Sequence, residues 1–258
     1  MKIAISGKGG VGKTFIASVL AYHFLNKGFK VLAIDADPSP NLAINLGLTF
    51  NDIKKIIPIS ENFELIKKKT DAGVPGIYNL SFSVEDVIEN YSIETPFGVN
   101  LIVMGVVRSA GEGCACPANA VIRTLLKHIF TKLKEVVIVD MEAGTEHLGR
   151  GTAKHVDLML IISDSNLKSL EVASKIHDLS TEMGLTRVFM VGNKISNKKE
   201  KEAISQFSIK HGIQLIGFVP YDEKIVKADI RGETPLIYAS KSKGVIAVRK
   251  IGEKILNF

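Results

Sequence analysis

The chain has 258 residues, of which 46% are hydrophobic and 23% charged, so its composition is that of a globular protein with a sizeable core rather than a disordered one. The formal net charge of +6 is a mild excess, and the lysine-rich runs at residues 67–69 and 198–199 are short. Short runs are typical of solvated helix faces, whereas an interface with DNA or RNA needs a clustered basic stripe. We therefore predict no nucleic-acid partner.

The cysteines and the apolar pattern indicate a reducing, aqueous compartment. Cys114 and Cys116 are separated by one residue, which is a poor spacing for a structural disulfide. The chain opens with a strand pattern instead of the apolar stretch of a signal peptide, and it holds no apolar run long enough for a transmembrane helix. We expect a cytoplasmic protein without stable membrane association.

Short runs rich in Ile and Val alternate with longer amphipathic segments along the chain. The short runs predict buried parallel strands at residues 2–6, 30–34, 100–104, 136–140, 158–163, 188–191 and 214–219. The amphipathic segments predict helices at residues 12–26, 117–132, 169–183, 198–211 and 241–256. Residues 51–95 are less regular and predict inserted helices and loops. This alternation indicates a single α/β domain, residues 1–258, with a doubly wound, mostly parallel sheet flanked by helices.

Residues 7–14 read Gly-Lys-Gly-Gly-Val-Gly-Lys-Thr and match the phosphate-binding P-loop pattern G-x-x-x-x-G-K-[ST]. They follow the first predicted strand and open the first predicted helix, which is the context that the pattern requires. Glycine lets backbone N–H groups approach phosphate oxygens, and the helix N-terminus adds a positive dipole end. We therefore predict a P-loop NTPase in which the nucleotide phosphates contact Gly9, Gly10, Val11, Gly12, Lys13 and Thr14.

Three carboxylates lie at the ends of predicted strands, where ligands bind in doubly wound sheets. Asp37 is the candidate that orients the attacking water, and Asp35 is the candidate for an outer contact of Mg²⁺, although either could instead cap a turn. Asp140 ends a strongly hydrophobic run that resembles a Walker B strand, and we expect it to order Mg²⁺ through water. Thr14 would complete the magnesium site with its hydroxyl, and Lys13 would supply catalytic charge to the β- and γ-phosphates.

The second lysine of the loop, Lys8, makes the loop similar to that of the deviant Walker A ATPases, the class of MinD, ParA and the nitrogenase iron protein. The resemblance implies a homodimer in which Lys8 acts in catalysis on the nucleotide of the partner subunit. It also supports Asp37, next to a proline, as the residue that orients water, and it implies that Asn193 and Pro220 contact the adenine of ATP. A solvated lysine at position 8 and an ordinary turn at Asn193 are the alternatives.

Cys114 and Cys116 lie in a glycine-containing segment before the predicted helix at residues 117–132. Two thiols at positions i and i+2 can bind one ion, but a structural zinc site has four ligands, which a homodimer would supply as four thiolates. Tetrahedral sulfur coordination suits Zn²⁺ or an Fe–S cluster, and a square-planar arrangement suits Ni²⁺. Taken alone, the pair is also compatible with two inert buried cysteines.

Together these motifs resemble the CooC family, the ATPases that assist nickel insertion into carbon monoxide dehydrogenase. The shared features are the loop at residues 7–14, the Cys-x-Cys pair at 114–116, and the segments Asp-Met-Glu-Ala-Gly at 140–144, Glu-His-Leu at 146–148 and Arg-Gly-Thr-Ala-Lys at 150–154. The resemblance implies a Mg²⁺-dependent ATPase that holds Ni²⁺ or Zn²⁺ between two subunits through Cys114 and Cys116, with carbon monoxide dehydrogenase as its client. His147 is a possible extra ligand that we interpret as a packed residue.

Other functions of this ATPase class are less well supported by the sequence. A MinD-like spatial-positioning ATPase without metal handling would need a membrane-binding helix, and the amphipathic segment at residues 245–258 is expected to complete the fold instead. A ParA-like DNA-binding ATPase finds little support in the mild charge. The nitrogenase iron protein takes a cluster cysteine from the region after its Walker B strand, and this chain has no cysteine between Asp140 and Gly151.

Overall fold

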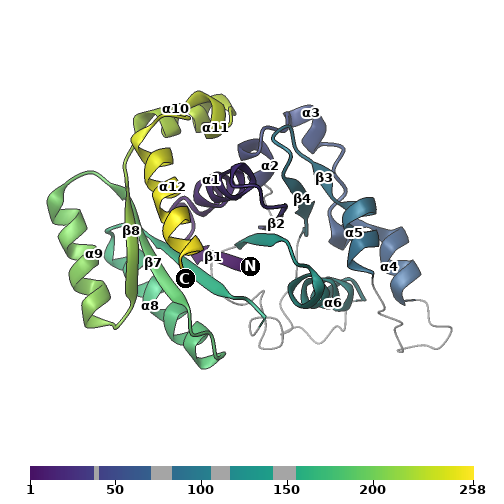
Figure 1. Ribbon diagram of the computed structural model, residues 1–258, viewed down its shortest axis with the longest axis horizontal. Helices are drawn as coiled ribbons and strands as arrows, with labels where there is room; N and C mark the ends of the chain where they lie inside the picture. The colour runs from purple at the N-terminus through teal and green to yellow at the C-terminus, as the bar shows by residue number, and fades with distance from the viewer. Residues whose placement is uncertain (38–40, 71–82, 106–116, 142–154) are drawn as a thin grey trace.

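In the computed structural model, helices cover both faces of a central sheet (Figure 1). The structure describes residues 1–37, 41–70, 83–105, 117–141 and 155–258. The strands in these ranges are β1 (Lys2–Gly7), β2 (Val31–Ala36), β3 (Ile93–Glu94), β4 (Asn100–Val103), β5 (Val136–Met141), β6 (Leu158–Ser163), β7 (Val188–Ile195) and β8 (Gln214–Pro220). Their order is β3-β4-β2-β5-β1-β6-β7-β8, and among the described pairings only β3 with β4 is antiparallel.

The helices alternate with the strands along most of the chain. They are α1 (Lys13–Asn26), α2 (Leu42–Asn45), α3 (Phe50–Ile53), the 3₁₀ helix η1 (Ile59–Glu61), α4 (Phe63–Thr70), α5 (Val84–Tyr91), α6 (Pro117–Lys132), α8 (Leu167–Glu182), α9 (Lys198–Lys210), α10 (Glu223–Arg231), α11 (Pro235–Tyr238) and α12 (Lys243–Leu256). In Figure 1, α9 lies at the β8 end of the sheet, and α4 and α5 lie near β3 at the other end. No helix in the described ranges is long and apolar enough to cross a bilayer.

Each face of the sheet has its own hydrophobic core. Successive residues of a strand point to opposite faces, so Ile3 and Ile5 pack in one core and Ala4 in the other. The first core joins the sheet to α1 and α12, and Phe24 is among its fully buried side chains. The second joins the sheet to α6, α8 and α9, with Leu125 as an example. Every residue of β1, β2, β5 and β6 is buried, which explains their continuous apolar runs.

The predicted doubly wound, mostly parallel sheet is confirmed, and each of the predicted strands and helices is present with bounds that differ by a few residues. Between residues 51 and 95 the structure has helices, as predicted, and also the short strand β3, which the prediction missed. Strand β3 has two residues, too few to show a hydrophobic period. Helices α10 and α11 were also missed, because they follow β8 in short, polar-flanked segments. That the whole chain is one domain stays a prediction.

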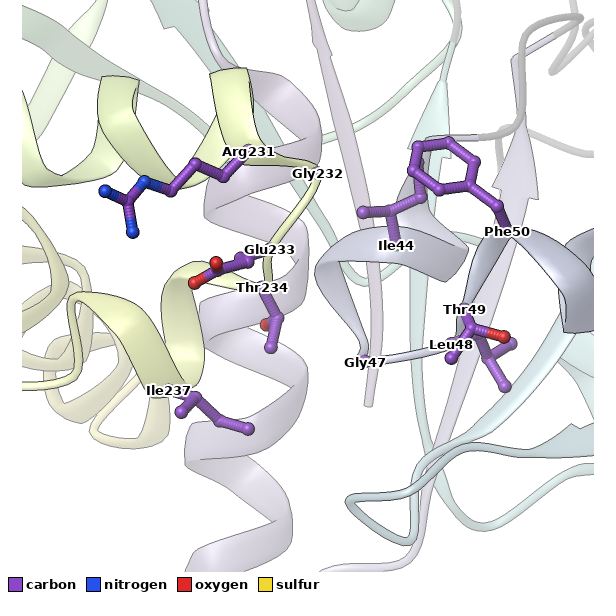
Figure 2. Close-up of a pocket in the computed structure, with 10 residues that line it drawn as sticks. All are labelled: Ile44, Gly47, Leu48, Thr49, Phe50, Arg231, Gly232, Glu233, Thr234 and Ile237. Atoms are coloured by element: carbon purple, nitrogen blue, oxygen red, sulfur yellow. The ribbon is translucent and has the colours of Figure 1, made fainter.

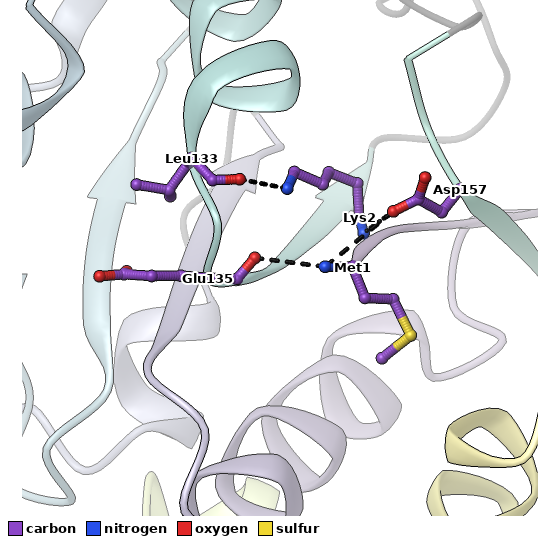
Figure 3. Close-up of polar contacts among 5 residues, drawn as sticks. All are labelled: Met1, Lys2, Leu133, Glu135 and Asp157. Carbon is purple, nitrogen blue, oxygen red and sulfur yellow. Dashed lines mark hydrogen bonds and ion pairs between the residues drawn. The ribbon is translucent and has the colours of Figure 1, made fainter.

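The amino-terminal edge of the sheet is held by contacts of the first residues (Figure 3). The backbone N–H of Lys2 donates to the Asp157 carboxylate at 2.8 Å, and the Lys2 ammonium donates to the Leu133 carbonyl. The amino group of Met1 lies 3.4 Å from the Glu135 carbonyl oxygen and 4.0 Å from Asp157. These contacts link β1 to the starts of β5 and β6, so the carboxyl ends of all three strands meet at the opposite edge.

Candidate nucleotide-binding site

The P-loop joins the carboxyl end of β1 to the start of α1, in the middle of the sheet. At Gly7 the chain passes so close to β6 that a methyl group would collide with the Ile162 carbonyl oxygen. At Gly12 the backbone is left-handed, with φ of 94°, and a methyl group would lie 2.5 Å from the Asn193 amide nitrogen. Glycine is therefore required at both positions by close contacts as well as by backbone conformation.

The first turn of α1 is suited to an anion. Gly12 is its N-cap, no side chain within the described residues caps it, and its first turn holds no acidic residue. The first N–H groups of a helix have no partner within the helix, and the helix dipole makes this end positive. A phosphate group at this end would accept hydrogen bonds from these N–H groups.

Lys13 is held inside the loop. Its side chain is buried, and its ammonium lies 3.4 Å from the Lys8 carbonyl oxygen. The backbone N–H of Val11 reaches the same oxygen, also at 3.4 Å. Both contacts are long for hydrogen bonds, so phosphate oxygens could replace them at small cost.

Asp35 and Asp140 lie side by side near the carboxyl ends of β2 and β5, where the two residues are register partners. Both are buried. The Asp35 carboxylate accepts the N–H of Asp37 at 3.1 Å and the N–H of Leu42, the first residue of α2, at 3.0 Å. Burial raises the pKa of Asp35 to about 7, the charge of Asp140 acts in the same direction, and the two N–H donors oppose the shift. Asp35 therefore links Asp37, the residue after β2, to Leu42 at the start of α2, and its outer contact with Mg²⁺ stays a prediction.

Asp140 is the described carboxylate whose surroundings best suit a cation. Burial raises its pKa to about 6, although a hydrogen bond from Thr14 and the charge of Lys13 favour the ionised form. The negative charge of Asp37 acts in the opposite direction and raises this pKa, which places Asp37 in the same cluster. The Oδ1 atom of Asp140 is buried and has no hydrogen-bond partner among the described residues. A buried carboxylate oxygen beside a threonine hydroxyl is a hard-oxygen donor set, which fits Mg²⁺ and its water ligands.

The end of β7 contacts the P-loop from outside. The buried Asn193 donates from Nδ2 to the Val11 carbonyl oxygen at 2.6 Å, and the Lys194 ammonium donates to the Gly10 carbonyl oxygen at 2.8 Å. The sequence predicted Asn193 as an adenine contact, and it missed both of these contacts with the loop. No sequence signal indicates them, because the partners lie 182 and 184 residues apart in the chain and Lys194 has a positive φ of 59°.

Pro220 ends β8 at the same edge of the sheet, where it pairs with Ile195. It lines a cavity of about 430 Å³ between β8 and α12. Another cavity, of about 330 Å³, lies between the α2–α3 and α10–α11 segments, with Phe50 and Ile237 among the side chains around it (Figure 2). None of the described residues that line these two cavities belongs to the P-loop, so neither cavity is assigned to the phosphates.

The predicted metal ligands Cys114 and Cys116 lie outside the described residues, as do His147 and the segment 142–144 that follows Asp140. In the part of the chain that the structure describes, no group of three or more His, Cys, Asp or Glu side chains is arranged to hold a metal ion. The structure thus brings together Lys13, Thr14 and the three aspartates, with Asn193 and Lys194 on the outside of the loop.

Comparisons with known proteins place the chain among nucleotide-binding domains. A family model described as the CobQ/CobB/MinD/ParA nucleotide binding domain matches residues 2–236. An uncharacterized ATP-binding protein of Methanocaldococcus jannaschii is 41% identical over 262 residues, covering 100% of this chain and 97% of its own. The carbon monoxide dehydrogenase accessory protein CooC of Rhodospirillum rubrum is 39% identical over 234 residues, covering 90% of this chain and 88% of its own.

Among solved structures, the MinC:MinD cell division protein complex of Aquifex aeolicus matches with a TM-score of 0.72 at 21% identity, covering 99% of this chain and 95% of that one. At this identity the likeness shows the fold alone. The family match spans the P-loop, the three aspartates and Asn193. The chain therefore belongs to the CobQ/CobB/MinD/ParA nucleotide-binding domain family, and within it the chain is a CooC-type ATPase.

Proposed function

We propose that the chain is a metallochaperone that hydrolyses ATP as a homodimer, binds Ni²⁺ or Zn²⁺ between its subunits, and assists nickel insertion into carbon monoxide dehydrogenase. The observation that carries the proposal is the 39% identity, over 90% of the chain, to a protein named as an accessory protein of that enzyme. The Cys-x-Cys pair at residues 114–116 supplies the metal ligands, two from each subunit.

The nucleotide site accounts for the ATPase step with the residues of this chain. The N–H groups of the loop and of the first turn of α1 bind the phosphates, and Lys13 leaves the Lys8 carbonyl to contact them. Thr14 and Asp140 hold Mg²⁺, which neutralises charge on the phosphates when it is bound. Asp37 orients the attacking water, and Asn193 and Pro220 contact the adenine. Lys8 extends to the nucleotide of the partner subunit and completes its site.

Hydrolysis can drive metal transfer only if the two nucleotide states of the dimer bind metal with different affinities. In the proposed dimer, Lys8 senses the partner's phosphates, so ATP holds the two Cys-x-Cys pairs together as four thiolates. Loss of the γ-phosphate weakens this contact and separates the pairs. The metal then has two thiolates in place of four and passes to the client.

The test is a titration of purified protein with Ni²⁺ and Zn²⁺, with and without a nonhydrolysable ATP analogue. The parent should show thiolate charge-transfer absorption at one metal per two chains and should sediment as a dimer. The variant Cys114→Ser/Cys116→Ser should lose the absorption and the tight binding, whereas the control His147→Ala should retain both. Binding of either metal by the double variant as tightly as by the parent would contradict the proposal.

A further inference from the structure

We propose that Lys194 is a positioning residue for phosphate binding, which orients the P-loop from outside together with Asn193. The two residues are adjacent at the end of β7, and they donate to two consecutive carbonyl groups of the loop. Lys194 binds the Gly10 carbonyl at 2.8 Å, and Asn193 binds the Val11 carbonyl at 2.6 Å. The inference rests on the proposed role of the loop in binding nucleotide phosphates.

Because the peptide bond is planar, a contact that holds a carbonyl group also sets the direction of the next N–H group. In a trans peptide the C=O and N–H groups point in opposite directions. Lys194 holds the Gly10 carbonyl, so the N–H of Val11 points the opposite way. It points towards the Lys8 carbonyl oxygen, which also contacts Lys13 inside the loop. In the same way, the contact of Asn193 with the Val11 carbonyl turns the N–H of Gly12 inward. Inward N–H groups in succession are the donors that bind phosphate oxygens.

Lys194 makes this contact from an unusual backbone conformation. Among the described non-glycine residues, only Lys194 has a positive φ, at 59°, a left-handed conformation that is unfavourable for a residue with a side chain. The strand register between β7 and β8 also shifts between Gly192 and Ile195. The Ile195 carbonyl accepts the N–H of Tyr221 at 3.0 Å beyond this irregularity, which holds the turn in place. Glycine would avoid the backbone cost at position 194 but would remove the contact with Gly10.

The two contacts differ in what surrounds them. The Asn193 amide is buried and packs against Gly12, so its replacement would disturb the loop directly. The Lys194 contact is exposed to solvent, so the residue can be replaced without leaving a buried group unpaired. An exposed charge-assisted hydrogen bond of this kind is worth about a tenfold change in affinity. Lys194 is therefore the residue at which the proposal can be tested.

The experiment compares Lys194→Met, Lys194→Gly and Lys194→Arg with the parent and with Lys198→Met, which alters an exposed lysine on α9 that pairs with Glu202 at 3.5 Å. Binding of Mg-ADP and of magnesium pyrophosphate is measured by calorimetry, and thermal unfolding is followed without nucleotide. The Met and Gly variants should bind both ligands about tenfold more weakly. The Gly variant should unfold at the same or a higher temperature, because glycine relieves the left-handed backbone. The Arg variant should stay close to the parent, and Lys198→Met should match it.

Three results would overturn the proposal. If the Met and Gly variants lost affinity for ADP but not for pyrophosphate, Lys194 would act on the base or ribose rather than on the loop. If Lys194→Gly bound both ligands as the parent does, the backbone alone would account for any effect of the Met variant. If the parent bound neither ligand, the phosphate site itself would be wrong, and the inference would fail with it.

Discussion

Asp35 is a buried carboxylate that holds its proton up to nearly neutral pH. Its pKa is about 7 in the folded protein, compared with 3.8 for an unperturbed aspartate, because burial and the nearby Asp140 disfavour the charged form. Between these values the folded chain binds a proton that the unfolded chain does not. The stability contribution of Asp35 is therefore largest in acid and declines as the pH rises towards 7, by at most about 1.4 kcal/mol per pH unit.

The variant Asp35→Asn should reduce this pH dependence in the nucleotide-free protein. Asparagine cannot ionise but can accept only one of the two N–H groups that now bind the carboxylate. We expect the variant to be less stable than the parent at pH 5.5 by about 1 kcal/mol, with the difference shrinking or reversing by pH 8. Urea unfolding across this range measures the effect. The control Asp178→Asn, at a 66% exposed side chain, should follow the parent, and parallel curves for Asp35→Asn would exclude the raised pKa.

A second prediction at the residue scale concerns the binding of magnesium by Asp140. Its Oδ1 atom is buried without a hydrogen-bond partner among the described residues, so a neutral asparagine should lose much of the attraction for a hydrated cation. Asp140→Asn should raise the Mg²⁺ concentration for half-maximal ATP hydrolysis by about 10- to 100-fold. ADP binding measured in EDTA should change little. An unchanged Mg²⁺ requirement would show that Asp140 is not part of the magnesium site.

At the scale of elements, the packing of α1 against α12 holds the helix that begins at the P-loop. His23 of α1 is buried against Gly252 of α12, and Glu253 lies 3.4 Å from the His23 ring and 2.6 Å from the Lys27 ammonium. Burial lowers the pKa of His23, while the charge of Glu253 opposes the shift. The close approach of the two helices thus depends on a residue without a side chain at position 252.

Gly252→Ala tests this packing, because its effect on stability should have opposite signs in a free helix and in the packed helix. In a free helix the change stabilises by about 1 kcal/mol, but here the new methyl group would lie 2.5 Å from the His23 ring. We expect a destabilisation of about 1–3 kcal/mol from overpacking. Thermal unfolding measures it, with Lys250→Ala on the exposed face of α12 as the control. If the variant with both Gly252→Ala and His23→Ala were destabilised by the sum of the single effects, the two sites would not be in contact.

At the scale of the whole molecule, the proposed role of Lys8 predicts a nucleotide site that two subunits share. If Lys8 acts on the partner's nucleotide, Lys8→Ala should bind Mg-ADP about as tightly as the parent but should fail to dimerise with a nonhydrolysable ATP analogue. Its ATP hydrolysis should fall by at least about tenfold, because positioned charge at the phosphates is lost. Sedimentation velocity and phosphate release measure the two effects.

The control for this prediction is Lys54→Ala, an exposed lysine beyond α3. It should dimerise and hydrolyse ATP as the parent does. Parent-like dimerisation and hydrolysis by Lys8→Ala would mean that Lys8 is a solvated lysine. The catalytic site would then be complete within a single chain.

The sequence by itself determined the features that are encoded locally. Continuous apolar runs specified the buried strands, because a strand covered on both faces needs apolar residues at every position. The P-loop could be read directly, because its glycines and Lys13 are contiguous and sit between a strand and a helix. Asp35 and Asp140 end apolar runs, so the sequence places them at strand ends and therefore at one edge of the sheet.

Only the tertiary structure decided which distant groups meet at that edge. The order β2-β5-β1 makes Asp35 and Asp140 register partners. Burial raises the pKa of both carboxyls, and the charge of Asp140 adds to the shift at Asp35. Asn193 and Lys194 contact loop residues that lie 182 and 184 positions away in the chain, and Lys194 does so with a positive φ, so no local pattern indicates these contacts. Local sequence sets hydrophobic periods and turns, whereas contacts across the chain depend on strand order and on the direction of each side chain.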